Sequence, residues 1–164
     1  MIGSFAHPAH AEPVEAWAAR EPHGLRQAQA ERASVLRFAG YAALFGKPDA
    51  GRDTIRRGAF ARTLAGRREP IPLLWQHRPD LRVGWIGAAA EDPRGLRVTA
   101  TVDNPDGRAG LALRRGAVSG LSFGYRARGS RATPQGRELY DIELFEVSLV
   151  THPRQHGARI HLIL

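Results

Sequence analysis

Three short segments each place a polar, reactive side chain in an apolar setting that is typical of strands. His77 ends the hydrophobic run PLLWQH, Ser122 is the centre of GLSFG, and Glu146 interrupts the stretch ELFEVSLV. Serine is a weak nucleophile at neutral pH and needs a base to accept its proton, and that base needs a third group to fix its tautomer. Together the three segments can supply a nucleophile, a base and an orienting acid.

Taken singly, each of these residues also has an ordinary structural role. A histidine at a strand end often bonds only to backbone, and a serine between glycines is as often part of a turn or bulge. Under strict alternation Glu146 shares a strand face with the aliphatic Ile142 and Leu144, so its carboxylate is costly to bury without a partner. A histidine or an arginine could be that partner, and the segment alone leaves both open.

The GxSxG pattern also occurs at the nucleophile elbow of α/β-hydrolases. Ser122, Asp141 and His152 even follow the chain order of the triad in that fold. The elbow requires a strand-turn-helix around the serine, whereas FGYRARGSRATPQG predicts a strand that runs into a loop. We therefore set the α/β-hydrolase interpretation aside.

Composition excludes several classes of enzyme, and the distribution of charge favours one kind of binding partner over another. The 164 residues include no cysteine, which excludes disulfides, Cys-ligated zinc, iron–sulfur clusters and a thiol nucleophile. The net charge is +8, but Lys47 is the only lysine among 24 basic residues and the arginines are scattered. The arginines do not alternate with aromatic residues in the pattern typical of nucleic-acid-binding proteins. We therefore favour an acidic protein partner over nucleic-acid binding by a β-barrel. No metal, cofactor or membrane segment is expected.

The chain divides into an N-terminal arm and one folded domain. Residues 1–33 are rich in Ala, Pro, Glu and His and too poor in apolar residues for a core, so we expect a loose arm. His7, His10 and His23 fit no helical metal-binding pair and are assigned no role. The folded domain is expected over residues 34–164.

Short segments rich in β-branched and aromatic residues, separated by Pro, Asp and Gly turns, predict a mainly β fold with peripheral helices. One helix is expected between Thr54, as its cap, and Gly66. A second is expected from Asn104, as its cap, to Arg115, with Gly116 in the left-handed conformation beyond it. The expected architecture is a mainly antiparallel β-barrel of the α+β class.

Six segments together resemble the tailed-phage prohead proteases, which are similar in fold to herpesvirus capsid-assembly proteases. In chain order they are GYAALFG, DTIRRGAF, IPLLWQHRPDLRVGWI, DPRGLRVTATV, LALRRGAVSGLSFGYRA and LFEVSLVTHP. The resemblance covers about residues 35–163 and implies a herpesvirus-protease-like barrel. It matches His77 to the family histidine and Ser122 to the family serine. Ser119 is a nearby hydroxyl on the opposite strand face.

The resemblance leaves the third catalytic residue open. Herpesvirus-type enzymes use a second histidine about two dozen residues past the serine, and Glu146 occupies that position here, which fits the phage branch. His152 stands where many phage relatives have an aromatic residue, so a Ser-His-His arrangement with His152 remains an alternative. The resemblance also implies an oxyanion loop after the third residue, with Arg154 as the best candidate and Gln155 beside it.

The implied function is that of a serine endopeptidase. It would cleave the scaffold, or the scaffold-like N-terminal segment of the major capsid protein, inside an assembling procapsid in the bacterial cytoplasm. The setting could be a phage, a prophage or a gene transfer agent, and residues 1–33 are a candidate for autocleavage. A homodimer is one option for the oligomeric state. The alternative is a catalytically inactive protease-like module for capsid or scaffold assembly.

Overall fold

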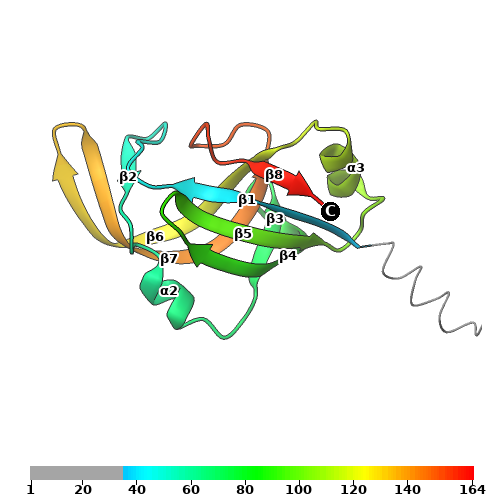
Figure 1. Cartoon of the computed structure of the whole chain (residues 1–164), viewed down its shortest axis with the longest axis horizontal. Coiled ribbons are helices and arrows are strands. Elements are labelled where there is room, and N and C mark those ends of the chain that lie inside the picture. The colour runs from blue at the N-terminus through cyan, green and yellow to red at the C-terminus, as the bar shows by residue number, and fades with distance from the viewer. Residues whose placement is uncertain (1–34) are drawn as a thin grey trace, which may run out of the picture. The chain divides into compact units, whose positions relative to one another are not determined.

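Strands dominate residues 35–164, which are the part of the chain that the computed structural model describes. The strands are β1 (Leu36–Leu44), β2 (Asp53–Ile55), β3 (Ile71–Trp75), β4 (Arg78–Glu91), β5 (Gly95–Val102), β6 (Gly120–Thr133), β7 (Gly136–Val150) and β8 (Ile160–Ile163). Two short helices of this part, α2 (Ala61–Ala65) and α3 (Arg108–Arg114), flank the strands (Figure 1). The expected mainly β fold is confirmed. The expected N-terminal arm and its histidines lie outside the described residues.

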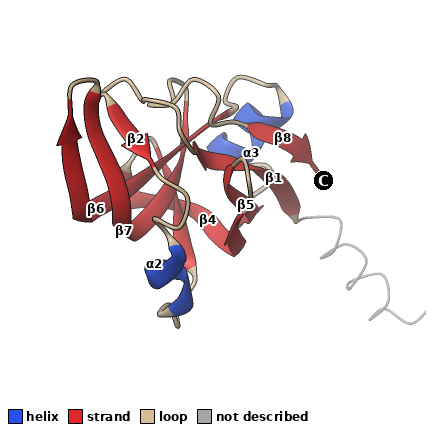
Figure 2. Cartoon of the chain, turned by 60° about the vertical axis from the view of Figure 1, so that its left-hand side comes forward, coloured by secondary structure: helices blue, strands red, loops and turns tan. Residues whose placement is uncertain are grey.

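The strands of the described residues belong to one sheet. Its order is β2-β7-β3-β4-β5-β1-β8, and β6 pairs with β7 off this path. Most neighbours are antiparallel, but β7 runs parallel to both β2 and β3. The sheet curls (Figure 2), because Ile160 donates its backbone N–H to Ser119 and Leu121 donates to Ala158, which brings the start of β6 to the start of β8. The result is a half-closed barrel.

The hydrophobic core fills the inside of this curl. Strands β1 and β5 bury alternate side chains, as expected for a sheet with one covered face. The largest side chains that are almost fully buried are Phe38, Phe60, Leu73, Leu96, Leu113, Leu121, Leu139, Ile142, Leu144 and Leu149. Because the core occupies the inner face, the outer face of β6 and β7 is left for polar side chains.

Both helices begin later than the sequence suggests, so the two expected caps are wrong. Thr54 lies in β2, and α2 begins only after Phe60. Asn104 uses its side-chain oxygen to accept a hydrogen bond from the N–H of Asp106, 3.2 Å away, and α3 begins after Gly107. The side chain of Asn104 thus stabilises a local turn, which is the common alternative for such a residue.

The C-terminal ends of the helices agree better with expectation. Gly66 follows α2 as expected, although with a right-handed backbone at φ −85°. Gly116 follows α3 closely and has φ +67°, the left-handed conformation that glycine adopts without strain. No helix within residues 35–164 is long and apolar enough to cross a membrane.

A buried carboxylate ties β2 to β6 and β7. Asp53 accepts hydrogen bonds from Arg137 at 2.9 and 2.8 Å and from the Tyr125 hydroxyl at 2.6 Å. The hydrogen bonds from Arg137 hold the pKa of Asp53 below its ordinary value. Burial, together with the bond to Asp53, raises the pKa of Tyr125 to about 12. The group is therefore ionic at neutral pH, with Asp53 charged and Tyr125 protonated.

Replacing Asp53 with asparagine should lower the free energy of unfolding by about 2–3 kcal/mol at pH 7, because Arg137 loses its charged partner. Folding lowers the pKa of this carboxylate, so the ionised group stabilises the protein at pH values above its pKa in the unfolded chain, which is near 4. That stabilisation is lost as the pH falls through the pKa of the group in the folded protein. Urea unfolding of both proteins at pH 7 and at about pH 3 should show the difference shrinking on acidification. An equal difference at both pH values would contradict the ionic role of Asp53.

Candidate active site

His77 lies in a tight turn between β3 and β4 rather than at a strand end. Trp75 pairs with Arg78, so Gln76 and His77 form a two-residue loop. Their φ angles are +51° and +57°. Two-residue hairpin turns with both φ values positive favour Asn and Gly, because other side chains are strained there. Strain at a histidine that sequence analysis singles out is typical of a functional position.

Strand β7 holds this strained turn in place. The backbone N–H of Gln76 donates to the carbonyl of Leu149 at 2.9 Å, and the N–H of His77 donates to Ser148 Oγ at 3.2 Å. Each bond satisfies a donor that the hairpin itself leaves unpaired. The backbone of His77 is therefore positioned by β7, a strand about 70 residues later in the chain.

Glu146 binds the His77 ring. The Nδ1 atom of His77 lies 2.7 Å from Glu146 Oε1, and the Ser148 hydroxyl donates to the other carboxylate oxygen, Oε2, at 2.6 Å. Glu146 is only 9% exposed, and a carboxylate accepts hydrogen bonds, so Nδ1 carries the proton. The other ring nitrogen, Nε2, is then the unprotonated one and can accept a proton.

The strand face of Glu146 differs from expectation because β7 contains a bulge. Glu146 pairs with Gly124. Leu144 pairs with Tyr125, the next residue of β6, so Phe145 is an extra residue in β7. A bulge of this kind shifts the alternation by one position, and Leu144 points into the core while Glu146 lies on the outer face. The expected common face of Glu146 and Leu144 is wrong, and the compensating partner is a histidine.

Gly124 makes room for the Glu146 carboxylate. A Cβ atom at Gly124 would lie 2.6 Å from Glu146 Oε1, which is closer than carbon and oxygen can approach. Ser122 is two residues earlier on the same face of β6 and lies directly opposite Ser148. Directly opposed Cβ atoms are about 4.5–5.5 Å apart. The Ser122 hydroxyl is therefore on the same face as the Glu146 carboxylate, beside the hydroxyl that holds it.

The described residues show no hydrogen bond between Ser122 and His77, so the expected contact stays a prediction. Ser122 is 7% exposed, and hydrogen bonds between nucleophile and base are often long in unliganded enzymes. The neighbouring Ser119 lies just before β6, where its hydroxyl accepts a hydrogen bond from Arg159 at 3.1 Å. That hydroxyl is engaged away from His77.

His152 lies apart from this arrangement. It is exposed in the loop after β7, and its Nδ1 atom lies 3.0 Å from Thr151 Oγ1. The structure thus brings Glu146, and not His152, into contact with His77. Residues 35–164 contain no group of three His, Asp or Glu side chains that could hold a metal ion.

The expected oxyanion loop reaches Ser122 and is firmly fixed. Arg154 and Gln155 line a small cavity together with Ser122. The Gln155 side chain binds both backbone groups of Leu44, at 2.6 and 3.0 Å, and the carbonyl of Lys47 at 2.9 Å. This buried amide is therefore an anchor of the loop to the end of β1.

Arg154 is anchored to the loop before β2. Its Nε atom donates to Asp49 Oδ2 at 2.8 Å, and its carbonyl accepts from the N–H of Ala50 at 3.0 Å. The other oxygen of Asp49 accepts from the N–H groups of Gly51 and Asp53, at 2.8 and 2.9 Å. Arg154 is thus held by a carboxylate that is itself fixed by its own turn.

Sequence analysis missed the part that Ser148 plays. Ser148 is fully buried and its hydroxyl serves two partners, as acceptor from the His77 N–H and donor to Glu146. A signal for it was present, because residues two apart in a strand share a face and Ser148 is two residues after Glu146. A fully buried hydroxyl beside a carboxylate is normally its hydrogen-bond partner.

The fold is similar to that of herpesvirus proteases. The protease of varicella-zoster virus matches 77% of this chain and 63% of its own, with a TM-score of 0.53 and 22% identity. The protease of KSHV, solved with a hexapeptide phosphonate inhibitor, matches 79% of this chain and 65% of its own, with a TM-score of 0.55 and 16% identity. At these identities the likeness concerns the fold.

Sequence similarity identifies the family. A capsid polyprotein of Pseudomonas phage PAJU2 is 32% identical over an alignment of 102 residues, and the match covers 56% of this chain and 15% of that polyprotein. The family model described as Caudovirus prohead serine protease matches residues 24–164. This match covers most of the chain, including the strands and turns that carry Ser122, His77 and Glu146. The chain therefore belongs to the Caudovirus prohead serine protease family.

Proposed function

We propose that this chain is a capsid-maturation endopeptidase with Ser122 as nucleophile, His77 as base and Glu146 as the orienting acid. The observation that carries this proposal is the 2.7 Å contact between His77 and Glu146, on the strand face that also holds Ser122. A histidine oriented by a carboxylate beside a serine is the geometry of nucleophilic acyl transfer.

In the first step Ser122 Oγ attacks the carbonyl carbon of the scissile peptide bond, and His77 Nε2 accepts the hydroxyl proton. The imidazolium that forms keeps its Nδ1–H on Glu146, whose negative charge stabilises it. The same proton then passes from Nε2 to the leaving amine as the carbon–nitrogen bond breaks. Water then attacks the acyl-enzyme, again with His77 as the base, and its attack releases the carboxylate product and restores the Ser122 hydroxyl.

The tetrahedral intermediate needs donors for its oxyanion. We assign these to backbone N–H groups of the loop with Arg154 and Gln155, because these residues line one cavity with Ser122. Each such donor contributes about 3–4 kcal/mol to transition-state stabilisation in serine proteases. The contacts of Gln155 with β1 and of Arg154 with Asp49 keep the loop in place before substrate arrives.

Ser148 is a positioning residue in this proposal. Replacing it with alanine should lower kcat about 10- to 100-fold with little change in KM, because Glu146 and the His77 backbone each lose a bond that fixes the base.

Ser119→Ala is the matched control for Ser148→Ala, since it removes a hydroxyl outside the site. It should leave both kcat and KM unchanged. If Ser148→Ala only lowered the melting temperature and left kcat intact, Ser148 would be structural alone.

The proposed substrate is the major capsid protein or its scaffold. Family membership supports this, and so does the similarity to a phage protein named a capsid polyprotein. The place of action is then the procapsid in the host cytoplasm, in a phage, a prophage or a gene transfer agent. A homodimer is compatible with this proposal.

Two measurements test the proposal together. A fluorophosphonate probe should label the wild-type protein at Ser122 and leave Ser122→Ala unlabelled. Mass spectrometry of the capsid protein and scaffold after incubation with each protein should find new termini only with the wild type. A folded wild-type chain that is neither labelled nor cleaves either protein is instead an inactive assembly module.

A further inference from the structure

A row of basic side chains continues from Ser122 along the outer face of β6. Arg126 is four residues past Ser122 and pairs with Glu143 across the hairpin. Arg128 reaches the same carboxylate with its guanidinium, at 2.7 Å from Glu143 Oε1, and Arg126 lies 3.5 Å from Oε2. Between the serine and these arginines stands Gly124, over which the Glu146 carboxylate lies. A chain lying on this face would therefore pass from the serine to the arginines.

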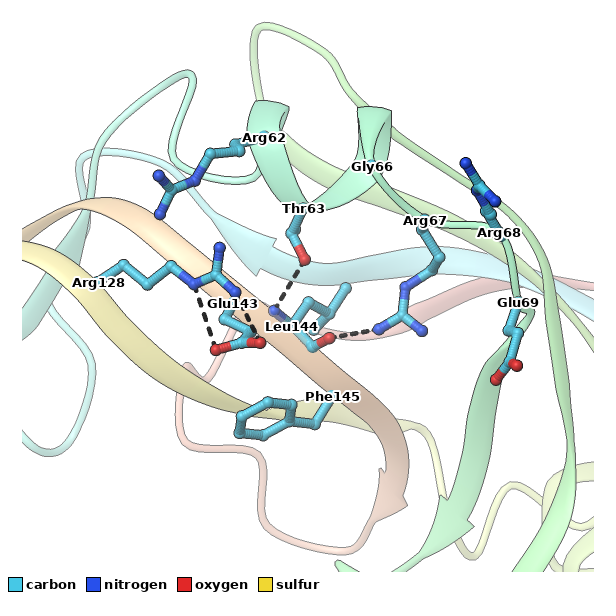
Figure 3. Close-up of a pocket in the computed structure, with 10 residues that line it drawn as sticks. All are labelled: Arg62, Thr63, Gly66, Arg67, Arg68, Glu69, Arg128, Glu143, Leu144 and Phe145. Atoms are coloured by element: carbon cyan, nitrogen blue, oxygen red, sulfur yellow. Dashed lines mark hydrogen bonds and ion pairs between the residues drawn. The ribbon is translucent and has the colours of Figure 1, made fainter.

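The end of α2 and the segment after it form a second wall beside β7. Thr63 Oγ1 accepts the N–H of Leu144 at 3.2 Å, and Arg67 donates to the carbonyl of the same residue. These bonds fix the wall at the β7 bulge, next to Glu146. Figure 3 shows the open groove between the two walls, which has a volume of about 470 Å³.

The groove carries excess positive charge. Four arginines and two glutamates line it, namely Arg62, Arg67, Arg68, Arg128, Glu69 and Glu143. Among the described residues Arg68 has no hydrogen-bond or ion-pair partner, so its guanidinium is free to bind another carboxylate. Phe145 is 43% exposed and adds an apolar surface. An acidic side chain with an apolar neighbour is complementary to these walls.

The distance to Ser122 sets the position of that acidic residue in a substrate. Because Phe145 is the extra residue of the bulge, Leu144 of the groove pairs with Tyr125, which is three residues past Ser122. At about 3.3 Å per strand residue this separation is about 10 Å, so the groove begins about three residues of extended peptide from Ser122 and is within reach of side chains three to five residues away. We infer that the groove binds an acidic side chain of the substrate, three to five residues from the scissile bond. This inference rests on the proposed function.

The test uses peptides that share the cleavage sequence found by mass spectrometry and carry Glu, Gln or Lys at each position three to five residues on either side. At one position Glu should raise kcat/KM about 10-fold over Gln and more over Lys at low ionic strength. The preference should shrink in about 0.5 M salt, because exposed charges are screened. Arg68→Glu and Arg128→Gln should each reduce it, with Arg68→Glu bringing the Glu-to-Lys ratio close to one.

Arg115→Glu is the matched control, since Arg115 is exposed in the turn after α3 and is not part of the groove. It changes the net charge as Arg68→Glu does and should leave the preference intact. Cleavage with equal kcat/KM for Glu, Gln and Lys at every position would overturn the acidic groove and leave the protease assignment standing. No cleavage of any peptide together with no probe labelling would overturn the protease assignment and this inference with it.

Discussion

Replacing Ser122 with alanine should lower kcat by about 10⁵- to 10⁶-fold, because the proposed acyl-enzyme can no longer form. KM should change little, since the hydroxyl contributes to the reaction rather than to binding of the rest of the peptide. The fold should be preserved, because Ser122 is a small buried residue and alanine fits its space. Single-turnover cleavage of the capsid protein and a thermal melt measure the two effects.

Ser119→Ala provides the comparison for this variant. It removes a hydroxyl three residues earlier in the chain and should retain wild-type kcat, because that hydroxyl binds Arg159. Substantial cleavage by Ser122→Ala, in protein free of wild-type contamination, would exclude Ser122 as the nucleophile.

Replacing Glu146 with glutamine should lower kcat by about 10⁴-fold. An amide has nearly the volume of the carboxylate, but it can donate to His77 Nδ1 and so favour the wrong tautomer, and it cannot stabilise the imidazolium. The protein should still fold, since Gln can keep the hydrogen bond from Ser148. Steady-state kinetics together with circular dichroism would separate lost catalysis from lost structure.

His152→Ala is the informative partner of this variant. His152 is exposed and its ring contacts Thr151, so kcat should stay within about twofold of the wild type. If instead His152→Ala abolished cleavage and Glu146→Gln retained it, the enzyme would use a Ser-His-His arrangement and Glu146 would be a structural partner of His77.

The strand content could be predicted from alternation and turn residues, which are local signals, whereas the likeness to herpesvirus proteases was implied by the resemblance of six segments to prohead proteases. The helix starts could not be predicted, because the Asn104 side chain binds the backbone two residues on, and Thr54 lies in β2, where it pairs with Glu138 of β7. In both cases a residue that is suited to cap a helix makes a turn or strand contact instead, and propensities read from a single sequence do not distinguish these two roles.

The candidate site was predictable in residue type but not in geometry. His77 and Glu146 were identified, whereas the bulge at Phe145 and the positive φ angles of the β3–β4 turn were not. Both features depend on how β7 pairs with β6 and β3, and that register is set by residues distant in sequence. The bulge decides the face of Glu146, so strict alternation placed it on the wrong one.

The strained turn of His77 ties catalytic competence to completion of the fold. Its two hydrogen bonds to β7 join residues that are about 70 positions apart in the sequence. Such long-range contacts form only after other interactions have offset the entropic cost of closing the intervening loop. Before β7 docks, only the two-residue hairpin favours positive φ at Gln76 and His77, and side chains of these types oppose it. In the proposed mechanism, a partly folded chain would present the serine without its base, so the newly made protein would stay inert until its last strands are in place.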